Sequence, residues 1–242
     1  MAKRKPFNWS VLDRSSLYSM LYKVAPLLVG RKLEIDAIHS ILAKHIKAHI
    51  PVKVARVKGF VADAGLIYMG GTYYSDNDQN GRRQVEVVFS YHLLDEFLTI
   101  TDYRFKRLCG LFADTILHEI VHMRQYRARN FKDIPGYEST AYYHKQRVDQ
   151  EYYGHRDEMG AFAFNIACEL TDRFAGDTGA IFEYMNSSIP KKHKRTSFYR
   201  YLNAFDWDHN HKIIVRLKKL VLNQLDNAIL GKPFKTQNHL TY

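Results

Sequence analysis

Two histidines and one glutamate stand at a spacing that suits a catalytic metal ion. His118, Glu119 and His122 belong to the pentad His-Glu-Ile-Val-His. Residues four apart on an α-helix lie one turn apart on the same face, so both imidazoles can bind one ion at roughly 2.0–2.1 Å. Glu119 is rotated by about 100° from His118, which lets its carboxylate flank the ion and take a proton from bound water.

The pentad is rare enough to carry information. With 12 histidines and nine glutamates in 242 residues, chance alone gives roughly 0.02 such pentads. Zinc is the metal that histidine and carboxylate ligands with an open position favour. A catalytic zinc ion usually has a third protein ligand. The place for a third histidine, six residues after His122, holds Ala128, so that ligand must come from elsewhere.

Three candidates for the third ligand stand together near the start of a later predicted helix. They are Glu158, His155 and Asp157. Glu158 is favoured, because Gly160 and Ala161 in the next turn would let this helix approach the metal helix closely. Asp157 can instead act as the first-turn carboxylate that a helix dipole favours. His155 and Asp157 stay open as alternatives.

An oxyanion that develops during hydrolysis needs a hydrogen-bond donor. Tyr152 and Tyr153 lie just before the third-ligand candidates and are predicted to be catalytic residues of this kind. His155 is a further candidate for that role, and Tyr142 and Tyr143 are weaker ones.

The hydrophobic pattern predicts an α+β fold around these residues. Apolar residues at helical spacing predict helices over 15–24, 32–49, 104–127, 156–174, 180–186 and 211–230. Strand patterns cover 52–60, 66–69 and 84–91, whereas 128–154 looks irregular. No linker is evident. The sequence predicts one domain over 1–242, made of an N-terminal arm (1–31), a core (32–174) and a helical C-terminal part (175–242).

The pentad resembles that of the zincin metallopeptidases, and a glutamate as third ligand is similar to the gluzincin branch. The stretch Tyr-Tyr-x-x-x-x-Glu-x-x-Ala-Phe-Ala from Tyr152 resembles small zincins often encoded by phages. The resemblance covers roughly residues 32–170. It implies a zincin-like fold, peptide-bond hydrolysis, zinc on His118, His122 and Glu158, and Glu119 as general base.

The same resemblance predicts where the substrate binds, but this chain departs from the family pattern at one position. In the related fold an edge strand holds an extended substrate, and residues 84–91 are expected to be that edge. Thermolysin-type members have an aspartate four residues after the glutamate ligand, where this chain has Phe162. A usual hydrogen-bond partner of a metal-bound histidine is therefore missing.

The net charge of the chain indicates binding partners other than a protein or peptide substrate. The net charge is +11, with basic runs at 3–5, 191–195 and 216–219. A nucleic acid or an acidic protein surface could bind there. One alternative is thus a nucleic-acid-associated protease, since Gly154-His155 also resembles the SprT-like proteases. A structural protein with a degenerate site is a second alternative, but its expected mark is the loss of Glu119.

Nothing in the sequence predicts a membrane span or a secretion signal. The longest apolar run near the start covers only 24–29, whereas a spanning helix needs about 20 apolar residues. A secretion signal needs roughly 7–15 directly behind a basic start, and no apolar stretch follows the basic residues 3–5. Cys109 and Cys168 do not form a metal-binding or disulfide framework. We expect a cytoplasmic protein, in the host cytoplasm if a phage encodes it.

Overall fold

The computed structural model describes residues 7–59, 64–82, 84–194 and 196–229. The basic run 3–5, Phe60, Arg195 and the expected end of the last helix near Gly231 lie outside these residues. The chain divides into two compact units, 1–123 and 124–242, and each is described by itself. The division falls within helix α5 (Asp102–Ala128), so no linker separates the units in sequence.

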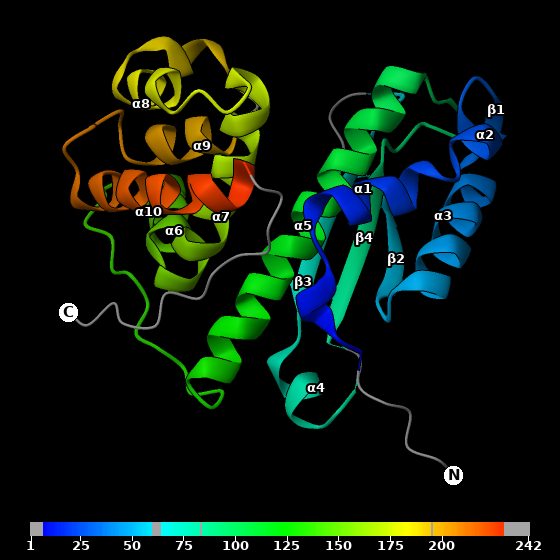
Figure 1. The fold of residues 1–242 in the computed structure, drawn as a ribbon, viewed down its shortest axis with the longest axis horizontal. Helices are drawn as coiled ribbons and strands as arrows, with labels where there is room; N and C mark the ends of the chain where they lie inside the picture. The colour runs from blue at the N-terminus through cyan, green and yellow to red at the C-terminus, as the bar shows by residue number, and fades with distance from the viewer. Residues whose placement is uncertain (1–6, 60–63, 83, 195, 230–242) are drawn as a thin grey trace. The chain divides into compact units, whose positions relative to one another are not determined.

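The first unit combines helices with two small sheets (Figure 1). β4 (Val85–Tyr91) is the central strand of a three-stranded sheet, between β2 (Lys53–Lys58), which is parallel to it, and the antiparallel β3 (Ile67–Tyr73). The expected edge strand at 84–91 is therefore wrong, because β4 has a neighbour on both sides. The other elements of this unit are η1 (Trp9–Val11), α1 (Arg14–Tyr22), α2 (Ala25–Leu28), β1 (Lys32–Glu34), α3 (Ile35–His49), α4 (Ser75–Gln79), β5 (Phe97–Thr99) and α5 as far as Met123.

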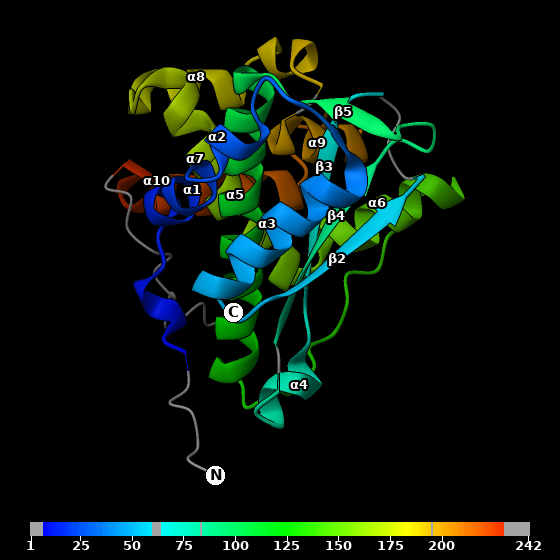
Figure 2. The ribbon, with the colours of Figure 1, turned by 90° about the vertical axis from the view of Figure 1, so that its right-hand side faces the viewer.

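Two helices, α3 and α5, pack on one face of the three-stranded sheet (Figure 2). Alternate residues of β4 point toward that face and are almost fully buried: Val85, Val87, Phe89 and Tyr91. On α3, the apolar residues recur at helical spacing, as an amphipathic helix requires. His39 of α3 meets the Phe89 ring edge-on, with centroids 6.4 Å apart. The mixed α+β class predicted from the sequence is confirmed.

Glu86 fixes the register of the parallel pair β2 and β4. It lies directly opposite Lys53, and its carboxylate accepts hydrogen bonds of 2.8 Å from Lys53 Nζ and from the Tyr74 hydroxyl. Burial alone would raise the pKa of Glu86. The two hydrogen bonds and the lysine charge together lower this pKa by more, so the net shift is downward. The ionised form therefore holds the strands together.

The second unit is helical. Its elements after the end of α5 are α6 (His144–Gly154), α7 (Arg156–Phe174), α8 (Thr178–Asn186), η2 (Ile189–Lys192), α9 (Ser197–Ala204) and α10 (Lys212–Ile229). α10 packs along α7 (Figure 1), and a buried cluster that includes Ile166, Leu170, Ile214 and Leu217 joins them. The helices predicted at 156–174, 180–186 and 211–230 are confirmed within a few residues.

The prediction of an irregular segment over 128–154 is wrong for its last 11 residues, where α6 forms. α6 has no apolar stripe, and only Gln150 and Gly154 are buried in it. Gln150 Nε2 donates to the Ala204 carbonyl at 2.9 Å, and its Oε1 accepts from the Ser139 hydroxyl. Polar tertiary contacts, which leave no periodic signal, thus help to hold this helix.

In the part of the chain that the structure describes, no helix is long and apolar enough to cross a membrane. Both cysteines are free thiols and buried. Burial raises the pKa of the Cys109 thiol to about 12, so this group is a neutral part of the core.

The Glu86 contacts predict a pH-dependent stability. Because the pKa of folded Glu86 lies below its ordinary value, its contribution to stability is present at neutral pH and disappears as the pH falls through the lowered pKa. Glu86→Gln should therefore unfold at lower urea concentration than the parent at pH 7. The difference should shrink between about pH 5 and pH 3. A constant difference across that range would contradict the ionic contribution.

Candidate metal centre

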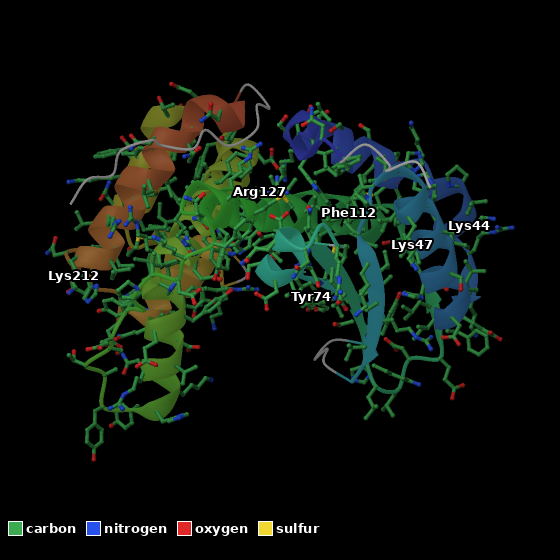
Figure 3. All side chains as sticks on the ribbon, turned by 90° about the horizontal axis from the view of Figure 1, so that it is seen from below. Lys44, Lys47, Tyr74, Phe112, Arg127 and Lys212 are labelled. Atoms are coloured by element: carbon green, nitrogen blue, oxygen red, sulfur yellow. The ribbon has the colours of Figure 1, made fainter. Side chains whose placement is uncertain are left out.

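Helix α5 carries the pentad, and its own packing fixes where the pentad lies. Thr101 caps the helix, with its hydroxyl accepting the Arg104 backbone N–H. Phe112, labelled in Figure 3, is fully buried. An ion pair of 2.7 Å between Arg14 Nε and Asp114 Oδ1 joins α1 to α5. The turn that follows, which bears the pentad, is therefore held on a rigid element.

The two histidines of the pentad face each other. His118 Nε2 and His122 Nε2 are 3.1 Å apart, and the rings are nearly perpendicular, at 76°. Two nitrogens on one tetrahedral zinc ion, each about 2.0–2.1 Å from it, would be about 3.3 Å apart. The imidazoles therefore already have the spacing that one shared ion needs.

Glu119 is buried and lies against the backbone of β3. A Cβ added to Gly71 would stand 2.6 Å from Glu119 Oε1 and 2.7 Å from Thr115 Cγ2. Only a glycine lets the strand and the helix approach this closely. The carboxylate next to the two imidazoles is thus held beside an edge strand of the sheet.

Glu158 is the expected third ligand and lies in the first turn of α7, in the second unit. His118 and His122 belong to the first unit, and the place of Glu158 beside them stays a prediction. Two imidazoles and a carboxylate are a donor set that suits a catalytic zinc ion.

The two alternative ligands make other contacts. The ring of His155 caps α7, with Nδ1 accepting the Asp157 backbone N–H at 3.3 Å. Asp157 is buried, and both of its carboxylate oxygens bind the guanidinium of Arg129, at 2.9 and 2.6 Å. These contacts favour Glu158 over both neighbours.

Contacts within the second unit hold the start of α7 against the last turns of α5. Gln125 Nε2 donates to the Asp157 carbonyl at 3.0 Å, next to the Arg129 pair. A Cβ on Gly160 would lie 2.7 Å from Gln125 Nε2. The small residue that the sequence analysis singled out thus permits a close helix approach, and Asp157 and Arg129 anchor it.

The predicted catalytic tyrosines lie at the end of α6. The side chain of Tyr152 is about half exposed, at 47%. Tyr153 packs against Phe162 and Tyr201, with ring centroids 5.7 and 4.8 Å away, and burial is the main cause that raises its pKa. Phe162 therefore belongs to an aromatic cluster. The role of both tyrosines as oxyanion donors stays a prediction.

Sequence reasoning missed Tyr201 of α9. This residue is fully buried, and its hydroxyl has no hydrogen-bond partner among the described residues. Burial and then the nearby carboxylate of Glu158 raise its pKa well above the ordinary value. Gly71 and Arg129 were missed as well. Each of these two residues contacts a residue that is distant in sequence, and no local sequence pattern predicts such a contact.

Comparisons with protein-family models, with curated proteins and with solved structures find no match for this chain. The resemblance to zincins therefore rests on the pentad and on the later Tyr-Tyr to Glu158 stretch of the sequence.

Gly71 gives a matched test of the helix–strand approach. Gly71→Ala should destabilise the protein by about 1–3 kcal/mol, because the new methyl group meets Thr115 and Glu119. Gly70→Ala is the control: its Cβ would meet nothing within 4 Å, so stability should change by less than about 0.5 kcal/mol. Urea unfolding measures both. Equal effects would mean that β3 and α5 are farther apart than described here.

Proposed function

We propose that the protein is a zincin-like, zinc-dependent peptidase. In this proposal His118, His122 and Glu158 bind the metal, and Glu119 is the general base. The observation that carries it is the 3.1 Å separation of the two Nε2 atoms on successive turns of one helix. The contacts that already occupy Asp157 and His155 favour Glu158 as the third ligand.

The chemistry assigned to each residue follows from its type and place. When bound, zinc would polarise a scissile carbonyl and lower the pKa of a water molecule towards about 7. Glu119 accepts the proton of the attacking water at a carboxylate oxygen and returns it to the amide nitrogen of the departing product. The close backbone of Gly71 limits how far this carboxylate can turn. Tyr152, with its exposed phenol, is our first choice as oxyanion donor, and Tyr153 is the second.

The substrate that this arrangement suits is an extended peptide. Among the described residues β3 pairs only with β4, so its outer edge can accept a further strand. β3, rather than the strand at 84–91, is therefore the proposed docking edge. A peptide added there would run past Gly71, beside Glu119. We propose protein or peptide chains as substrates, and the cytoplasm, where two free thiols persist, as the place of action.

Replacing the proposed base should separate catalysis from metal binding. Glu119→Gln should retain zinc and lower peptide cleavage by about 10²- to 10⁴-fold, because the amide cannot accept the proton. Glu151→Gln, on the exposed side of α6, makes the same chemical change away from the centre and should cleave like the parent. Zinc content and mass-spectrometric detection of cleaved unstructured peptides give the two readouts. Glu119→Gln that cleaves at the parental rate would refute the assignment.

The third ligand is tested by metal content. Glu158→Ala should lower bound zinc after dialysis, while His155→Ala should retain it. Asp157→Ala should also retain zinc but lose stability, because Arg129 would then be left without its buried carboxylate. Zinc loss in Asp157→Ala or His155→Ala, with normal zinc in Glu158→Ala, would move the ligand.

A further inference from the structure

Most of the net positive charge of the chain comes from one stretch of the second unit. Residues 186–225 contain nine lysines and arginines but only two acidic residues. Their net charge of +7 is more than half of the +11 of the whole chain. The proposed peptidase chemistry uses none of these residues.

The fold brings several of these charges, among the described residues, near one another. Lys218 Nζ of α10 donates to Asn186 Oδ1 at the end of α8, at 2.9 Å, and lies 3.1 Å from His209 Nδ1. Lys191 Nζ of η2 stands 5.1 Å from the centre of the Trp207 ring. The end of α8, η2, the loop before α10 and α10 itself therefore meet. We call this region the basic surface; it comprises Lys191, Lys192, Lys194, Lys212, Arg216, Lys218 and Lys219.

Helix α10 adds a row of cations to the basic surface. Lys212, Arg216 and Lys219 lie at helical spacing on one face of the first two turns (Lys212 is labelled in Figure 3). The opposite face of the helix is buried in the core through Ile214 and Leu217. The row is thus fixed in place by packing.

Five lysines of the basic surface are exposed and form no ion pair with a described carboxylate. None of the described carboxylates forms an ion pair with Lys191, Lys192, Lys194, Lys212 or Lys219, and all five are exposed. The pKa values of two histidines near these cations are lowered. Burial and then Lys218 and Lys191 lower the pKa of His209, and burial and then Arg173 and Lys192 lower that of His193.

We propose that the basic surface binds the phosphate backbone of a nucleic acid. Lysines and arginines that neutralise phosphates supply most of the affinity in such contacts. A protein partner is less favoured, since lysine is depleted at protein–protein interfaces. A membrane is also less favoured, because an interfacial helix presents an apolar face to lipid, whereas the apolar face of α10 is buried. Such contacts with phosphates depend on charge and do not distinguish one base sequence from another.

Salt-dependent binding of a short fluorescent DNA duplex tests this proposal. The variant replaces Lys191, Lys192 and Lys219 by Gln. A matched control replaces Lys23, Lys44 and Lys47 of the first unit, which are exposed and give the same loss of net charge; Lys44 and Lys47 are labelled in Figure 3. The slope of log K against log salt should become shallower by about 2–3 in the variant, with at least about tenfold weaker binding at low salt. The control should bind like the parent.

Three results would overturn the proposal: no binding of DNA at low salt, equal weakening of both triple variants, or vesicles of anionic lipid or polyglutamate binding the parent as tightly as DNA. Thermal unfolding of each variant confirms that folding is intact. Glu119→Gln should bind DNA like the parent, so this test is independent of the proposed hydrolysis.

Discussion

Two imidazole nitrogens lie 3.1 Å apart on successive turns of α5, and the proposed metal centre depends on this spacing. Such a pair is costly to assemble from flexible segments, because each side chain must be fixed before the ion is bound. One continuous helix solves this problem, since its geometry sets the distance between residues four apart. The packing of α5 on the sheet and the ion pair of Asp114 with Arg14 then keep the helix in place.

Two glycines let the backbone of one element come close to a side chain of another. Gly71 lets β3 reach Glu119, and Gly160 lets α7 reach Gln125. Asp157 and Arg129 form a partly buried, bidentate ion pair at the start of α7. The residue before Glu158 thus acts as an anchor for α7. Small residues and one ion pair set how closely these elements approach one another.

The sequence predicts the elements whose signal is local. α7 begins and ends at the predicted residues, and α5 within two, because apolar residues repeat at helical spacing in both. The order of strands depends on pairing between distant segments, so the central position of β4 was not foreseen. α6 was missed because polar contacts of Gln150 stabilise it. Likewise, nothing near Tyr201 in sequence links it to Glu158.

In the proposed metal centre, one zinc ion would bind two imidazoles and one carboxylate and keep an open position. X-ray absorption at the zinc edge of the purified parent protein reports the ligand atoms directly. We expect one zinc per chain with a first shell of nitrogen and oxygen at about 2.0–2.2 Å and the outer-shell scattering of two imidazoles. A shell that contains sulfur at about 2.3 Å, or scattering from no imidazole at all, would contradict it.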